Sequence, residues 1–307
     1  MHIPNAMLQG GICPVTAVVG AIGIGFVAFR AFFAEHKPSA ARFAAITSLI
    51  FAGQMMNFPI NGGTSGHLLG SVLAVALLGV PFGILSMAFV VTIQCLIFSD
   101  GGFTVLGANV LNMAIIAAGL SGIILRAFTK KFPLRSPQYM ISLGLAAWVS
   151  IMIAASACSI ELAISGTIPF FRVIGAMLST HALIGVGEGL ITVVVCFALA
   201  SKPVSISQKG SVAVPLIASS IVAVILSPFA SGLPDGLEWV AQKYAFFHES
   251  APTFVSPLSD YTISAISNET LAAGLAGIIG VVATFFIAWI AARLLNKSKQ
   301  LEIRPLL

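Results

Sequence analysis

Charge is scarce in this 307-residue chain: only 8% of the residues are Asp, Glu, Lys or Arg, and 58% are hydrophobic. A soluble domain carries about 25% charged residues, so this composition excludes an ordinary soluble protein. Long apolar runs separated by short polar segments instead predict transmembrane helices of about 20 residues each. The short alternating segments of a membrane β-barrel are missing. The formal net charge of +5 comes from basic residues in short loops, so it does not indicate binding to nucleic acid.

Sequence motifs for catalysis are also missing. No GxxxxGK[ST] or HExxH sequence occurs, so the chain has neither a P-loop for ATP nor the helix of a zinc protease. We expect no catalytic residue and no catalytic cofactor. The four cysteines lie in apolar segments without metal or redox spacing, which indicates buried small side chains. Residues 1–29 contain no Lys or Arg, so a signal peptide is not expected and the N-terminus should belong to the mature protein.

The apolar runs predict an all-α polytopic membrane protein with about nine transmembrane helices. The candidate spans are 13–32, 43–59, 66–79, 81–98, 106–126, 138–158, 174–200, 212–229 and 270–295. Pro81 divides one long apolar stretch, which is compatible with a helical hairpin or with a single kinked helix.

The basic residues predict the orientation. With the N-terminus outside and nine spans, the segments 30–42, 126–137, 201–211 and the tail from Arg293 are cytoplasmic. These segments hold 13 of the 15 Lys and Arg residues, and only Arg172 and Lys243 remain outside. This distribution follows the positive-inside rule and favours the hairpin at Pro81, because a single kinked helix would reverse every later loop. The C-terminus is then cytoplasmic.

Two predicted outer loops are unusual. Residues 59–67, PINGGTSGH, are rich in Gly and Ser and end in a histidine, whereas residues 230–269 form the only long hydrophilic segment. This second loop is acidic, because it carries five Asp or Glu residues and one lysine. We expect a seven-helix core at 1–205 and a two-helix module at 206–307 that contains the acidic loop.

The pair Met1-His2 can bind a metal ion. Met aminopeptidase removes Met only before small residues, so His2 should leave Met1 in place with a free α-amino group. The amine, the His2 amide nitrogen and the His2 ring nitrogen can close fused chelate rings around one ion. Such a planar nitrogen set suits Ni(II) or Cu(II) and leaves a fourth position open. His67, predicted on the same side of the membrane, is the candidate fourth ligand.

Each histidine taken alone has a simpler interpretation. His2 can be an accident of a frayed terminus, and His67 can be a polar residue at a helix end. The shared membrane face and the flexible Gly62-Gly63 turn beside His67 favour the metal site over this alternative.

Four ordered segments resemble one family. MHIPNAML at 1–8, NFPINGGTSGHLLG at 57–70, FSDGGFTVLGANVLNMA at 98–114 and HALIGVGEGLIT at 181–192 are similar to CbiM/NikM. These proteins are the substrate-binding membrane components (S components) of energy-coupling-factor transporters for cobalt and nickel. SPFASGLPDGLEWVAQKY at 227–244, with its flanking spans, resembles the PDGLE module, the fused counterpart of the small CbiN/NikN subunit.

The resemblance implies a ligand set and partners. The ion would be held by the amino and amide nitrogens of Met1-His2, the His2 ring and His67. The chain departs from the family at Asn5-Ala6, where members often read Asp-Gly, so contacts of this loop are expected to differ. A transmembrane coupling protein (EcfT/CbiQ-like) and a separate ABC ATPase (CbiO/NikO-like) would drive the import.

Polar residues near the predicted site have two interpretations each. Asn109 and Asn112 lie three apart on one helix face and can either orient the ligand-bearing segment and His67 or join helices. Thr64 and Ser65 can orient the loop in the same way or cap the next helix.

Polar residues in or beside other spans are equally open. His181 and Glu188 share the seventh span and can form a polar relay or, as the favoured interpretation, a structural pair. Asp100 can attract cations or simply form a turn.

The sequence therefore predicts the metal-specific component of an ATP-driven importer in a bacterial or archaeal plasma membrane, with Ni²⁺ or Co²⁺ as its transported substrate. Planar coordination through an amide nitrogen slightly favours nickel, although cobalt importers share this N-terminus. The alternative is an independent secondary permease. That class would need several buried carboxylates, of which Glu188 is the clear candidate.

Overall fold

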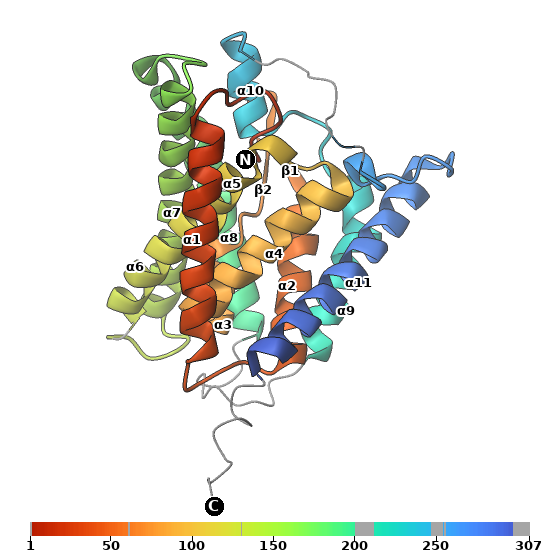
Figure 1. Ribbon diagram of the computed structural model, residues 1–307. Helices are drawn as coiled ribbons and strands as arrows, with labels where there is room; N and C mark the ends of the chain where they lie inside the picture. Colours follow the sequence, from red (N-terminus) through yellow and green to blue (C-terminus); the bar gives the residue numbers. More distant parts are fainter. Residues whose placement is uncertain are drawn as a thin grey trace, which may run out of the picture.

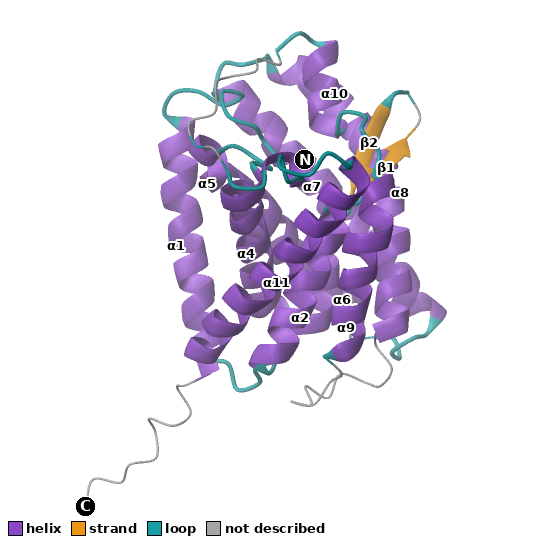
Figure 2. Ribbon diagram, turned by 90° about the vertical axis from the view of Figure 1, so that its right-hand side faces the viewer, coloured by secondary structure: helices purple, strands orange, loops and turns teal. Residues whose placement is uncertain are grey.

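The computed structural model describes residues 2–60, 62–129, 131–199, 212–246, 254 and 256–296. The described part is a bundle of helices with one two-stranded β-hairpin at one end (Figures 1 and 2). Met1, the expected boundary near residue 205 and most of the expected cytoplasmic tail lie outside the described residues.

The bounds of the elements are as follows. The helices are α1 (Ile12–Phe32), α2 (Ala40–Gln54), α3 (Ser71–Leu78), α4 (Val80–Phe98), α5 (Leu106–Asn109), α6 (Gly119–Thr129), α7 (Pro137–Ile164), α8 (Phe170–Leu199), α9 (Ala213–Ile221), α10 (Gly236–Lys243) and α11 (Glu269–Asn296). Shorter helical segments are η1 (Phe103–Val105), η2 (Val110–Ala118), η3 (Val222–Leu226), η4 (Ser227–Phe229) and η5 (Ser259–Tyr261). The strands are β1 (Asn57–Ile60) and β2 (Thr64–His67), which pair antiparallel.

Six helical segments of the described chain are long and apolar enough to cross a membrane, which makes the protein a multi-pass membrane protein. They are α1, α4, the run from η1 to α6, α7, α8 and α11. Each of the nine predicted spans contains helix. However, α2, α3 and the run from α9 to η4 are shorter than the six membrane-spanning segments.

The predicted spans 43–59 and 66–79 are wrong in their bounds. Helix α2 ends at Gln54, and the predicted loop 59–67 is largely the β1–β2 hairpin, so α3 has only eight residues. Proline and glycine explain the break. Pro59 has no N–H to continue a helix, and Gly62, Gly63 and Gly70 have φ values of +90°, +81° and +77°, which side-chain-bearing residues rarely adopt.

The extended segment 64–70 continues into α3 and is buried along its whole length. Leu68 and Leu69 connect β2 to Gly70, whose left-handed φ leads into α3. Non-helical backbone that is buried in this way must find hydrogen-bond partners inside the protein. The N–H groups of Leu69 and Gly70 donate to the two carboxylate oxygens of Glu188 on α8, at 2.6 and 2.8 Å.

The hairpin interpretation at Pro81 is confirmed, and the single kinked helix is wrong. Helix α3 ends at Leu78, Gly79 follows with a φ of +81°, and α4 runs back beside α3. The two helices are so close that a Cβ on Gly83 would lie 2.8 Å from the Cα of Val75.

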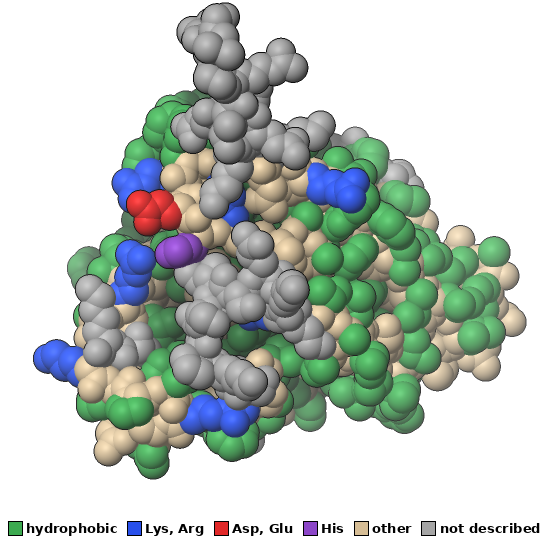
Figure 3. Space-filling model, turned by 90° about the horizontal axis from the view of Figure 1, so that it is seen from below, with side chains coloured by type: hydrophobic (Ala, Val, Ile, Leu, Met, Phe, Trp, Pro, Cys, Tyr) green, Lys and Arg blue, Asp and Glu red, His purple; other side chains and the backbone are tan. Residues whose placement is uncertain are grey.

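The end of the bundle opposite the β-hairpin carries many of the basic side chains (Figure 3). Several of them bind the last carbonyl groups of helices. Lys37 donates to the carbonyl of Leu295 near the end of α11, and Arg135 donates to that of Phe197 near the end of α8. A cation is favoured there because the unpaired carbonyls make a helix C-terminus negative.

Candidate metal centre

The N-terminal segment is anchored through Ile3, the residue after His2. The Ile3 N–H donates to Oδ1 of Asn109 at 2.8 Å, and its carbonyl accepts from Nδ2 of Asn109 at 3.1 Å and from the N–H of Gly102 at 2.8 Å. Ile3 is 1% exposed and His2 is 6% exposed. The segment that begins at His2 is therefore docked against the fold.

The turn before η1 makes room for this segment. Gly101 has a φ of +87°, and a Cβ there would lie 3.3 Å from Cβ of His2 and 2.9 Å from Nδ2 of Asn109. Asn5 accepts hydrogen bonds from the backbone and hydroxyl of Thr104 at 3.1 and 2.9 Å. Ala6 has a φ of +66°, which residues with a side chain rarely adopt.

The structure brings the two predicted histidines together. The rings of His2 and His67 stack with centroids 5.4 Å apart and planes inclined by 15°. His67 ends β2 and reaches this position because the β1–β2 hairpin folds back at Gly62-Gly63. Nδ1 of His67 lies 3.0 Å from the carbonyl of Leu68, which can only accept, so Nδ1 carries the proton and Nε2 is the ring nitrogen that faces Asp235.

A carboxylate faces each histidine. Asp100 Oδ1 lies 2.9 Å from Nδ1 of His2, and Asp235 Oδ2 lies 4.0 Å from Nε2 of His67. Asp100 also accepts a hydrogen bond of 2.6 Å from the hydroxyl of Tyr261. Burial opposes the ionisation of Asp100, but His2 and these hydrogen bonds outweigh it and hold its pKa below the usual value.

Two of the four donors predicted for a metal ion are main-chain nitrogens, the Met1 amine and the His2 amide. Met1, which would supply the amine, lies outside the described residues. In the described part of the chain, no three His, Cys, Asp or Glu side chains are grouped as a metal site. Nε2 of His2 is buried and has no hydrogen-bond partner among the described residues. The described contribution to a site is therefore His2 with His67, beside two carboxylates.

Thr64 and Ser65 bind the acidic loop and do not cap the next helix, so the capping interpretation is wrong. Ser65 donates from its N–H to the carbonyl of Pro234 at 2.8 Å and from its hydroxyl to that of Leu233 at 2.8 Å. The Thr64 hydroxyl donates to Pro234 at 3.2 Å. Helix α3 begins after Gly70 without a side-chain cap.

The module closes over the hairpin through further contacts. The N–H of Ser231 donates to the carbonyl of Asn57 at 2.8 Å, and the indole of Trp239 on α10 donates to that of Gly62 at 3.1 Å. Asp235 caps α10 by accepting from the N–H groups of Leu237 and Glu238. Figure 1 shows α10 at the same end of the molecule as β1 and β2.

The remaining polar candidates separate into different roles. Asn112 donates to Glu161 on α7 at 2.6 Å and so joins helices, which was one of its two interpretations. The favoured pairing of His181 with Glu188 is wrong. Nδ1 of His181 bonds to the carbonyl of Met177, whereas Glu188 accepts from the N–H groups of Leu69 and Gly70. Each of the two side chains therefore has a backbone partner, and they do not bind one another.

Three contacts were not predicted from the sequence. Tyr261 carries no motif that would relate it to Asp100, and Glu161 lies among apolar residues of α7. Asp235 belongs to the PDGLE sequence, so its motif was a signal, but its approach to His67 depends on the folded module.

The two asparagines allow a matched test. Replacing Asn109 with alanine should weaken metal binding about 10- to 100-fold, because the segment that carries His2 loses both bonds at Ile3. Asn112→Ala breaks a helix contact away from this segment and should keep metal affinity within about threefold. Calorimetric titration of both purified variants distinguishes them, and equal losses would contradict the positioning role of Asn109.

Two known families match consecutive parts of the chain. Residues 2–206 match the family CbiM, described as the cobalt uptake substrate-specific transmembrane region, and residues 209–297 match the PDGLE domain. The chain belongs to the CbiM family. It carries a C-terminal PDGLE domain in addition.

Similar proteins have the same fused arrangement. A protein of Archaeoglobus fulgidus, named as a fused nickel transport protein, NikMN, is 36% identical over 297 residues, covering 93% of this chain and 97% of its own length. The fused nickel transport protein NikMN of Rhodobacter capsulatus is 27% identical and covers 92% and 94%. A crystal structure of a truncated transition metal transporter is 30% identical, with a TM-score of 0.57, over 65% of this chain and 98% of that one.

Proposed function

We propose that this CbiM-family chain is the substrate-specific membrane component of an ATP-driven importer of Ni²⁺ or Co²⁺. It captures the ion at the outer face through the Met1 amine, the His2 amide and ring nitrogens, and His67. The stacked rings of His2 and His67, which come from distant parts of the chain, are the observation that carries the proposal. The names of the fused nickel transport relatives support the same substrate class.

The domain division belongs to this proposal. Residues 1–205 form the metal-binding core with the N-terminus outside, and residues 206–307 form the module that closes over the β-hairpin. The contacts of Ser65 and Trp239 support this arrangement because they join the module to the segment that ends in His67.

A separate ATPase and a transmembrane coupling protein complete the importer in the plasma membrane. The absence of a P-loop sequence from the full chain supports a separate ATPase. An independent permease is less well supported. The buried carboxylates Glu161 and Glu188 are engaged by Asn112 and by backbone N–H groups rather than lining a path for protons.

Asp100 competes with the ion in this mechanism. Of the two His2 ring nitrogens, only Nδ1 can close a six-membered chelate ring with the His2 amide nitrogen. Nδ1 donates to the Asp100 carboxylate in this structure, so an ion that binds Nδ1 displaces its proton and breaks this hydrogen bond. The carboxylate stays close and offsets the added positive charge, and the return of a proton to Nδ1, which restores the hydrogen bond, favours release.

Titration of the purified chain with Ni(II) tests the proposal. We expect one ion per chain with the absorption and diamagnetism of a planar nitrogen site, and His67→Ala should lower the affinity at least about 100-fold. His36→Ala, an exposed histidine outside the site, is the control. A chain that binds neither Ni(II) nor Co(II), or equal binding by His67→Ala, would contradict the proposed capture site.

A further inference from the structure

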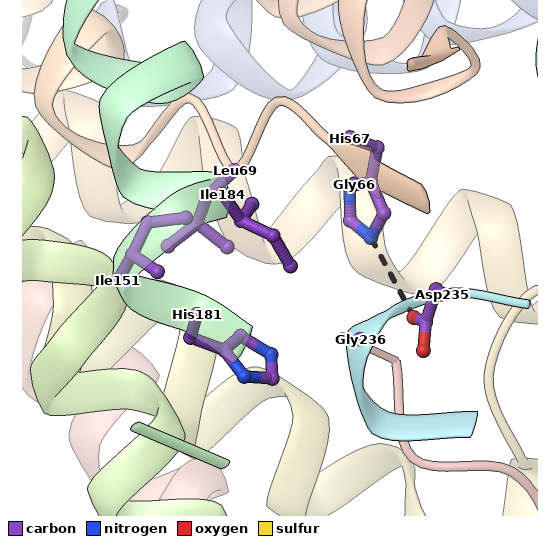
Figure 4. Close-up of a pocket in the computed structure, with 8 residues that line it drawn as sticks. All are labelled: Gly66, His67, Leu69, Ile151, His181, Ile184, Asp235 and Gly236. Atoms are coloured by element: carbon purple, nitrogen blue, oxygen red, sulfur yellow. Dashed lines mark ion pairs between the residues drawn. The ribbon is translucent and has the colours of Figure 1, made fainter. Parts of the chain in front are cut away.

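A small cavity adjoins the candidate capture site, because His67 belongs to both. It is lined by His67, Asp235 and His181, together with Leu69, Ile151 and Ile184 and the backbone of Gly66 and Gly236 (Figure 4). Its volume is about 10 Å³, which is room for one water molecule or one ion. Figure 4 shows the His181 ring facing the same space as Asp235, on the other side from His67.

The protonation of His181 follows from its hydrogen bond. Nδ1 lies 2.7 Å from the carbonyl of Met177, and a carbonyl can only accept, so Nδ1 carries the proton. In the neutral ring Nε2 then has a free lone pair. Nε2 is buried in a residue that is 1% exposed, and it has no hydrogen-bond partner among the described residues. A buried polar atom without a partner is costly, so a ligand at this position is expected.

Gly236 keeps the space in front of this nitrogen open. A Cβ on Gly236 would lie 3.2 Å from Nε2 of His181 and 2.7 Å from a methyl carbon of Ile184. The module thus brings the N-terminal end of α10 close to α8 without filling the cavity, and it brings the carboxylate of Asp235 to the same place.

We propose that His181 is an inner metal ligand, which receives the ion from the capture site on its way inward. The inference rests on the proposed function. The ion leaves His2, stays on His67 and binds Nε2 of His181, while Asp235 offsets its charge and water completes the coordination. Imidazole nitrogen suits both Ni(II) and Co(II). Two protein nitrogens hold the ion more weakly than the capture site, as passage requires, because an ion bound too tightly would not leave.

His181→Asn is the sharpest variant. An asparagine amide nitrogen lies near the position of Nδ1, so it can still donate to Met177, but the variant has no atom in place of Nε2. The inner site is measured in a full-length chain with about ten residues added before Met1, because this extension takes the free amine away from His2 and leaves His67 and His181. His36→Asn in the same background is the control for an exposed histidine.

Co(II) is the probe, followed by visible absorption. We expect the extended chain to bind Co(II) about 100-fold more weakly than the natural chain, and His181→Asn to weaken this residual binding at least tenfold further. In the natural chain His181→Asn should keep capture affinity within about threefold, yet reduce uptake by the assembled transporter at least tenfold.

The possible failures are distinct. Equal residual Co(II) binding by the extended chain and its His181→Asn variant, or full uptake by the natural-length variant, would overturn the inner ligand alone. An extension that leaves binding unchanged at low Co(II) would instead overturn the proposed capture site, and the inner ligand with it.

Discussion

An extension of about ten residues before Met1 should abolish metal capture, lowering affinity for Ni(II) at least about 100-fold, or about 2.8 kcal/mol. The extension turns the Met1 amine into a peptide nitrogen and places the new amine too far from His2 to close fused chelate rings with it. The following residues cannot shift to compensate, because Ile3 is held by Asn109 and Gly102 and is almost fully buried.

The matched control places the same extension after Leu307. Both forms are titrated with Ni(II) at concentrations near the dissociation constant of the natural chain, where only the capture site fills. The C-terminal form should bind as the natural chain does. Equal binding by both forms would show that the amine is not a ligand, although the fold would be unaffected.

Glu188→Ala should destabilise the segment that follows His67, at Leu69 and Gly70. The N–H groups of Leu69 and Gly70 would lose their acceptors in a buried segment, at about 1–3 kcal/mol for each. Water cannot reach these buried N–H groups to replace the carboxylate. We therefore expect a large fall in thermal stability. We also expect at least a tenfold loss of metal affinity, because this segment directly follows the strand that carries His67.

Glu188→Gln is the graded control. Its amide offers one acceptor oxygen for two N–H groups, so its unfolding temperature should lie between those of the natural chain and Glu188→Ala. Thermal unfolding in detergent and Ni(II) titration of all three proteins check this order. An alanine variant as stable as the natural chain would mean that this carboxylate does not support the extended segment.

Composition and apolar runs were sufficient to predict a multi-pass helical membrane protein and to locate most of its helices. They failed at residues 55–70, where hydrophobicity is high enough for a span but Pro59 and the glycines prevent a helix. Hydropathy measures only the preference for an apolar surrounding. It does not tell whether a side chain elsewhere, here Glu188, satisfies the backbone, so an extended buried segment scored as a helix.

The candidate site was partly predictable for a related reason. Met1-His2 and the histidine of GGTSGH are local patterns with a chemical meaning, and the meeting of the two rings agrees with their predicted positions on one face. Asn109 could be singled out because a buried amide needs partners. Its actual partner is the backbone of Ile3, and no periodicity indicates which of several nearby segments a side chain will bind.

The contacts between the module and the β-hairpin also matter for association between molecules. A two-stranded hairpin leaves both of its outer edges unpaired, and such edges can pair with strands of other chains. Here residues 231–235 contact the backbone of each strand once. The N–H of Ser231 donates to the carbonyl of Asn57 on β1, and Asp235 forms a bridge with Ser65 on β2. The module therefore occupies a backbone group on each edge of the hairpin that a strand of another chain would otherwise pair with.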